Sequence, residues 1–267
     1  MDFYAVNPGS VNEDDFELQL SYNWIINKNK QQINYTTSDE YGSSAAHENI
    51  DVMYAIAKNQ TQNSNGGMVK FNFKHILSQI AFKAKTQYDD MVVEINGLKI
   101  HNVRSHGTFT LPTDENSEVS RENNWSNNDK YIQVTVGMKN TATADKKDVA
   151  TDVFTKPMLF VPQELTPWST KTTPKTKEQA DVDHESYIEI SCKIKQKGAY
   201  LFGDDTNYGT LYVPFNGNWQ PGKRYVYTLI FGGGYDDQGQ PILSPINFDA
   251  ETEDWVEDTN NNEFITQ

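Results

Sequence analysis

The chain has 267 residues, of which 36% are hydrophobic and 12% aromatic, so it is long enough for one large β domain or two ordinary ones. Its formal net charge is −14 at pH 7. A surface so acidic repels phosphate backbones and anionic lipid headgroups, which argues against nucleic acid and membrane surfaces as partners. No stretch is long and apolar enough for a transmembrane helix.

Apolar and polar residues alternate with a period of two through the first half of the chain. This alternation occupies residues 69–73 and 80–84, and it predicts strands with one buried and one solvated face. A short helical turn is expected at residues 75–78, between the two strands.

The first long polar segment covers residues 112–129, which are rich in Asn, Glu and Ser. Its composition predicts a solvated loop. We take this loop as the domain boundary and expect two domains, residues 1–112 and 113–267.

The second half of the chain repeats the strand pattern. Residues 132–138 and 188–194 alternate in the same way, whereas residues 224–231 are apolar on both faces and predict a central strand. Residues 166–185, with two prolines and several Thr and Lys, predict a mobile loop. Glycine-rich and Asn-Gly turn signals separate the strands, and this spacing predicts an all-β protein built of β-sandwiches.

Cys192 is the single cysteine, so the chain has no internal disulfide and no cysteine-based metal site. It lies on the apolar parity of its strand, which predicts a buried structural role. The glycines at 232–234 follow a strand, as in a phosphate-binding loop, but turn residues rather than a helix follow them, which favours a hinge. Residues 236–239 contain two Asp and a Gly but lack the ligand series of a calcium loop.

His101 and His106 are the nearest approach to a zinc site. Two histidines without a third ligand are a weak signal, and surface histidines are the expected interpretation. The sequence has no nucleophile elbow and no selectable carboxylate pair. We therefore expect no catalytic, cofactor-binding or metal-binding residues and no enzymatic activity.

The tryptophans lie in or beside predicted loops; they are Trp24, Trp125, Trp168, Trp219 and Trp255. Aromatic side chains in loops either plug the ends of a sandwich or stack on sugar rings. The second interpretation gives an alternative function, that of an extracellular carbohydrate-binding module.

Several sequence blocks, in this order, cover nearly the whole chain and resemble the fimbrillin-like family of Gram-negative gut and oral anaerobes. They are DVMYA at 51–55, VKFNFKHILSQIAFKAK at 69–85, GTFTLP at 107–112, FVPQEL at 160–165 and WQPGKRYVYTL at 219–229.

The resemblance implies two tandem transthyretin-like β-sandwich domains. It also implies a structural or adhesive subunit of a surface fimbria (pilus), with β-strand addition between subunits. The expected partners are other pilin subunits and a receptor on a host or bacterial surface. The expected location is extracellular, at the outer membrane, through a lipoprotein anchor upstream of this chain.

One departure from the family concerns the N-terminus. The lipobox cysteine and the strands that precede the family's counterpart of Phe3–Val6 are missing here. We therefore expect the first domain to be incomplete, with apolar side chains such as Phe71, Ile80, Phe82 and Ile95 poorly covered. Residues 242–255 are a candidate donor strand.

Overall fold

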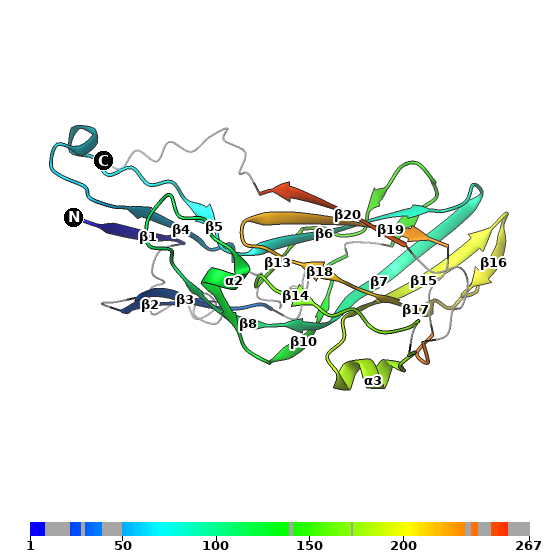
Figure 1. Cartoon of the computed structure of the whole chain (residues 1–267). Coiled ribbons are helices and arrows are strands. Elements are labelled where there is room, and N and C mark those ends of the chain that lie inside the picture. The colour runs from blue at the N-terminus through cyan, green and yellow to red at the C-terminus, as the bar shows by residue number, and fades with distance from the viewer. Residues whose placement is uncertain are drawn as a thin grey trace.

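The computed structural model describes residues 1–8, 22–27, 30–38, 50–138, 141–171, 173–232, 236–239 and 247–255. These residues are mostly strands, arranged as two β-sandwiches along an elongated molecule (Figure 1). The all-β prediction is confirmed, whereas the transthyretin-like topology stays a prediction.

The first sandwich, which holds the N-terminus, consists of a three-stranded and a four-stranded sheet. In order across each sheet, the strands are β1 (Phe3–Asn7), β4 (Met53–Ala57) and β5 (Lys74–His75), and then β2 (Tyr22–Asn27), β3 (Lys30–Thr36), β8 (His106–Thr110) and β9 (Trp125–Asn127). Val6, Ile33, Tyr54 and Phe109 come from both sheets and form one hydrophobic cluster.

The second sandwich consists of a five-stranded and a six-stranded sheet. The five-stranded sheet contains β6 (Ser78–Thr86), β12 (Thr151–Asp152), β13 (Met158–Phe160), β19 (Lys223–Phe231) and β20 (Asn247–Asp254). The six-stranded sheet contains β7 (Met91–Arg104), β10 (Tyr131–Thr135), β11 (Ala142–Ala144), β15 (Tyr187–Gln196), β16 (Ala199–Phe202) and β17 (Gly209–Pro214). The remaining elements are β14 (Glu164–Leu165), β18 (Gly217–Asn218), the 3-10 helix η1 (Ser64–Gly67), α2 (Arg121–Asn124) and α3 (Lys177–Val182).

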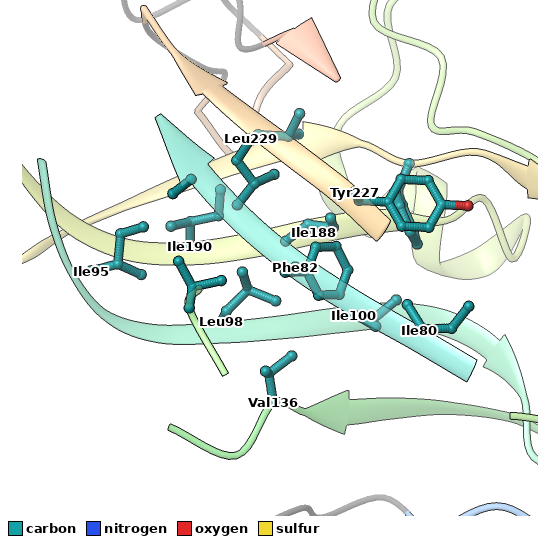
Figure 2. Packing of buried hydrophobic residues seen from close by; sticks show 14 of the residues in the cluster. Ile80, Phe82, Ile95, Leu98, Ile100, Val136, Ile188, Ile190, Tyr227 and Leu229 are labelled. Atoms are coloured by element: carbon teal, nitrogen blue, oxygen red, sulfur yellow. The ribbon is translucent and has the colours of Figure 1, made fainter. Parts of the chain in front are cut away.

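The core of the second sandwich lies between its two sheets. Phe82 and Leu229 from one sheet meet Ile95 and Ile190 from the other (Figure 2). β19 lies between β6 and β20, so the strand predicted to be central is central. It pairs with β6 in parallel.

The two sandwiches are interleaved along the chain. Residues 78–104 form β6 and β7, which pair with β19 and β15, while residues 106–110 return to the first sandwich as β8. A boundary at residue 112 therefore does not separate the two hydrophobic cores. Because Ile80, Phe82 and Ile95 belong to the second core and are fully buried, the expectation that they are poorly covered is wrong.

Two segments predicted to be loops contain regular structure. Residues 112–129 include α2, whose first turn is capped by the Ser120 hydroxyl, and β9. Residues 166–185 include α3, where Thr176 and Gln179 form a capping box. Residues 75–78, predicted as a helical turn, instead end β5 and begin β6.

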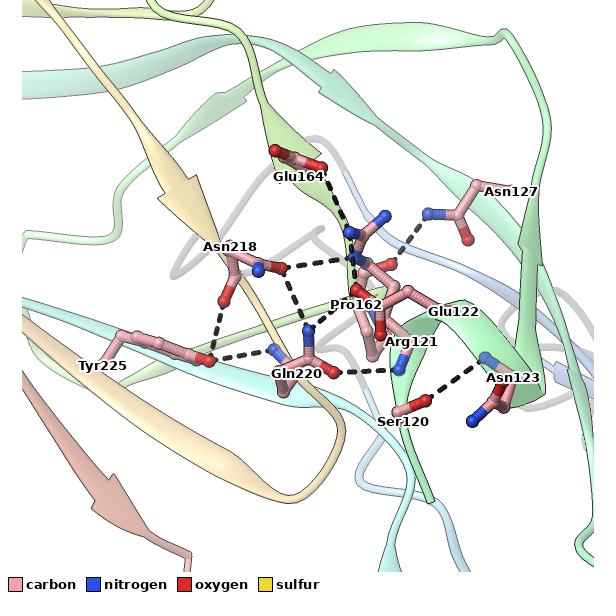
Figure 3. A network of polar contacts seen from close by, with 10 residues as sticks. All are labelled: Ser120, Arg121, Glu122, Asn123, Asn127, Pro162, Glu164, Asn218, Gln220 and Tyr225. Carbon is pink, nitrogen blue, oxygen red and sulfur yellow. Dashed lines mark hydrogen bonds and ion pairs between the residues drawn. The ribbon is translucent and has the colours of Figure 1, made fainter. Parts of the chain in front are cut away.

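Polar contacts join the two sandwiches. The backbone N–H of Arg121 in α2 donates to Gln220 Oε1 at 2.9 Å, and the Arg121 guanidinium contacts Glu164 and Asn218 (Figure 3). Asn218 and Gln220 in turn contact the hydroxyl of Tyr225 in β19.

An aromatic stack and a backbone hydrogen bond join the sandwiches as well. The rings of His75 and Trp255 stack with centroids 3.8 Å apart, and Gly222 N donates to Leu77 O.

Candidate functional site

The histidines considered for zinc do not come together. His101, expected at the surface, is buried in β7, where its ring stacks on Tyr187 with centroids 4.4 Å apart. His106 lies in β8, where Nδ1 contacts the hydroxyl of Ser105. Among the described residues, no group of three or more His, Cys, Asp or Glu side chains is placed to hold a metal ion.

His101 belongs to a polar cluster on the outer face of the six-stranded sheet. His101 Nε2 lies 2.9 Å from Glu189 Oε2, and Lys99 Nζ lies 3.0 Å from Glu189 Oε1. The hydrogen bond from His101 and the one from Lys99 together outweigh desolvation and lower the pKa of Glu189 to about 2. Glu189 is thus a charged group held by two donors.

A second carboxylate, Asp181 of α3, extends this cluster. It accepts hydrogen bonds from Tyr187 at 2.7 Å, Asn102 at 3.1 Å and Lys177 at 2.8 Å. Burial alone would raise the pKa of Asp181, but these donors lower it below its ordinary value. Two of these donors, Asn102 and Tyr187, belong to strands of the six-stranded sheet, so their hydrogen bonds to Asp181 anchor α3 to that sheet.

The other sequence candidates are structural where the structure describes them. Cys192 is buried, which confirms its predicted role, and burial raises the pKa of its thiol to about 12. The segment 236–239 is a turn in which Gly239 N donates to Asp236 O. Gly233 and Gly234 lie outside the described residues.

The four loop tryptophans whose side chains the structure describes do not form a sugar-binding surface. Trp125, Trp168 and Trp219 are buried, and Trp255 is half-buried against His75. The structure does not describe the side chain of Trp24. The observation that motivated a carbohydrate-binding module therefore no longer supports it.

Two exposed strand-like edges are the features that packing leaves unexplained. The first is β20, the last strand of its sheet, which pairs with β19 alone among the described strands. Its residues 249–254, DAETED, are all exposed. An unpaired edge of this kind presents free N–H and C=O groups.

The second edge is the segment 68–73, which leads into β5 on the upper side of Figure 1. Residues 69–73 were predicted as a half-buried strand, but they form neither a strand nor a backbone hydrogen bond in the described chain. Met68, Phe71 and Phe73 are 64%, 38% and 41% exposed. The alternation exists in the sequence, but no sheet of the described residues covers Phe71 and Phe73.

The two edges approach each other at a pocket of about 560 Å³ between the sandwiches. Phe73, Tyr54 and Trp255 form part of its wall, and Lys223 and Asp254 lie at its side as an ion pair. The Tyr54 hydroxyl is buried and has no hydrogen-bond partner among the described residues, and burial raises its pKa to about 12. Around this pocket, three kinds of group have no partner among the described residues: the backbone of the two edges, the apolar side chains of residues 68–73 and the Tyr54 hydroxyl.

The family of the chain follows from comparison with known sequences. The family model described as fimbrillin-like matches residues 1–255. The chain therefore belongs to the fimbrillin-like family, and the sequence-based resemblance is confirmed.

One solved structure supports the fold, and a second is a similar protein only. A fimbrial protein from Bacteroides vulgatus superposes with a TM-score of 0.62 at 16% identity, covering 95% of this chain and 77% of that one. A protein from Bacteroides uniformis, described as a cell-adhesion candidate, gives a TM-score of 0.41 at 14% identity, with 96% and 72% covered. A search of curated proteins finds no significant match.

Membership of the fimbrillin-like family identifies the chain as a structural protein rather than an enzyme. No helix in the described ranges has the length and apolar character needed to cross a bilayer.

Proposed function

We propose that the protein is a structural or adhesive subunit of a surface fimbria and that it joins its neighbours by β-strand addition. The observation that carries the proposal is the pair of unpaired edges, β20 and residues 68–73, in a chain of the fimbrillin-like family. Strand addition uses such edges because main-chain hydrogen bonds give affinity and alternate side chains give specificity.

The energetics favour a partner that is already ordered. An added strand of about ten residues buries about five side chains at roughly 1.5–3 kcal/mol each, while ordering its backbone costs a similar amount. An incoming strand that is held by its own fold does not incur most of that cost. Strand addition between folded subunits therefore has a lower cost in conformational entropy than addition of a disordered strand.

The proposal extends to location and partners. It places the subunit at the outer surface of the cell as an exported lipoprotein, in contact with other pilin subunits and with a surface receptor. The family supports a cell-surface position. The acidic net charge of −14 supports solubility outside the cell and argues against nucleic acid as a partner.

The test is electron microscopy of the producing bacterium with antibodies against the purified chain. We expect gold label along surface filaments, loss of those filaments when the gene is deleted, and their return on complementation. Label confined to the cytoplasm, or filaments unchanged by the deletion, would contradict the proposal.

A further inference from the structure

The residue pattern of the basic edge complements that of the acidic edge. In residues 68–74, MVKFNFK, Lys70 and Lys74 share one parity of the sequence and Phe71 and Phe73 share the other, so an extended strand would place them on opposite faces. The Lys70 side chain makes no ion pair in the described chain, and Lys74 Nζ donates to the Glu115 carbonyl at 2.8 Å. Neither lysine has a carboxylate partner among the described residues.

On β20, Asp249, Glu251 and Glu253 share the face on the outer side of the sheet, whereas Asp254 has the opposite parity. Glu251 lies opposite Val226 and Glu253 opposite Arg224, and the described residues give neither acid an ion pair. The other face carries Ala250 and Thr252, which lie opposite the buried Tyr227 and Tyr225. Those two small residues are at the rim of the core but remain exposed.

We propose that residues 68–74 of one copy pair antiparallel with β20 of a second copy, extending its five-stranded sheet by one strand. In the register that gives both lysines an acidic partner, Lys70 lies opposite Glu253, Asn72 opposite Glu251 and Lys74 opposite Asp249.

The opposite face of the same register matches as well. Phe71 comes to lie over Thr252 and Phe73 over Ala250, so the aromatic rings cover the rim of the core that β20 leaves exposed. Aromatic pairs with β-branched residues and opposite charges are favourable cross-strand neighbours. A parallel register also pairs both lysines with acids, but antiparallel pairing is the more stable and more frequent arrangement.

Pairing occurs between copies because the two edges do not pair within one chain. Phe73 and Asp254 line the same pocket, yet the described chain has no backbone hydrogen bond between residues 68–73 and β20. The contact joins different surfaces of the two copies, a geometry that can propagate into a filament. The inference rests on the proposed function, for which it names the two edges that meet.

Mixed disulfide formation tests the pairing. Two preparations of the full chain, distinguished by tags of different size, carry Asn72→Cys in one and Glu251→Cys in the other. The native Cys192 gives little background because it is buried and its thiol pKa is raised to about 12. We expect the mixed-size disulfide dimer to exceed both same-size dimers. The matched control replaces Glu251→Cys by Thr252→Cys, whose side chain points to the other face.

Charge reversal tests the register. Lys70→Glu should weaken self-association, measured by analytical ultracentrifugation, by about tenfold, since an attractive cross-strand pair becomes repulsive. Adding Glu253→Lys to the Lys70→Glu chain should restore self-association, because the two changed residues meet across the contact between copies. Adding Asp249→Lys instead should not restore it. Rescue by Asp249→Lys instead would overturn the antiparallel register. A mixed dimer no more abundant than the Thr252→Cys control would overturn the pairing itself, while surface filaments in the bacterium would still support the fimbrial function.

Discussion

Two buried tyrosine hydroxyls, one in each sandwich, differ in their hydrogen bonding. In the second sandwich, Tyr187 donates to Asp181 at 2.7 Å, within a cluster whose donors and acceptors are matched. In the first sandwich, the part of the chain that the structure describes offers no hydrogen-bond partner to the hydroxyl of Tyr54 and no backbone partner to the neighbouring segment 68–73. Buried polar atoms without a partner among the described residues occur in both sandwiches, including Gln196 Oε1 and Arg224 Nε in the second. The contrast therefore concerns these two hydroxyls and the exposed segment 68–73 rather than the sandwiches as wholes.

The comparison predicts unequal stability. We expect the first sandwich to unfold before the second, because Phe82 and its neighbours belong to strands that are nine or more residues long, whereas β1, β4 and β5 are short. Fluorescence of Trp125 reports on the first core and that of Trp219 on the second.

The largest expected effect comes from truncating the second core. Phe82→Ala removes a fully buried ring that packs against Phe215 and Tyr227, so it should lower the free energy of unfolding by about 3–5 kcal/mol. Phe109→Ala is the matched change in the first core. In urea titrations, each variant should shift the transition of its own sandwich first. A single coincident transition for both variants would show that the contacts between the sandwiches couple them fully.

The next effect concerns the charged Glu189. Its pKa in the folded protein, about 2, lies below the ordinary value of about 4.5, so ionised Glu189 stabilises the fold above pH 4.5. That contribution is lost as the pH falls from 4.5 toward 2. Glu189→Gln should cost about 1.5–3 kcal/mol at pH 7 because two donors lose a charged acceptor.

The measurement for Glu189→Gln is a series of urea titrations between pH 2.5 and 7. The gap between the variant and the parent protein should shrink as the solution becomes more acidic. A gap that is constant with pH would mean that the charge of Glu189 contributes nothing to stability.

The comparison also shows what the sequence could and could not predict. The long strands and their buried faces follow from period-two alternation, and Cys192 was placed correctly from parity alone. The alternation at residues 69–73 is equally clear, but alternation describes one strand and says nothing about whether a neighbour pairs with it. Sequence reasoning therefore found the pattern of this edge and missed that it stays unpaired.

Long-range pairing also limited the domain assignment. The excursion of residues 78–104 into the second sandwich depends on β6 pairing with β19 and β7 with β15, contacts that local pattern does not encode. α3, by contrast, had a local signal that went unused. Thr176 and Gln179 stand at the spacing of a capping box, within a segment that composition alone assigned to a loop.

A smaller effect is expected at α3. Thr176→Ala removes the side-chain half of the capping box and should destabilise the helix by about 1 kcal/mol. Hydrogen exchange of residues 177–182 should accelerate, since α3 packs over Trp168 and Tyr187 only while it is folded. Thr173→Ala, an exposed position in the same segment, is the control and should leave exchange unchanged.

The smallest expected change returns to the two tyrosines. Tyr54→Phe removes a buried hydroxyl that has no partner, so the free energy of unfolding should stay within about 0.5 kcal/mol of the parent value or rise. Tyr187→Phe deletes a hydrogen bond to a carboxylate and should cost about 1.5–3 kcal/mol. Both variants keep the ring, so thermal and urea unfolding isolate the hydroxyl in each case. A loss at Tyr54 as large as that at Tyr187 would mean that the Tyr54 hydroxyl is satisfied, and the contrast between the two tyrosines would fail.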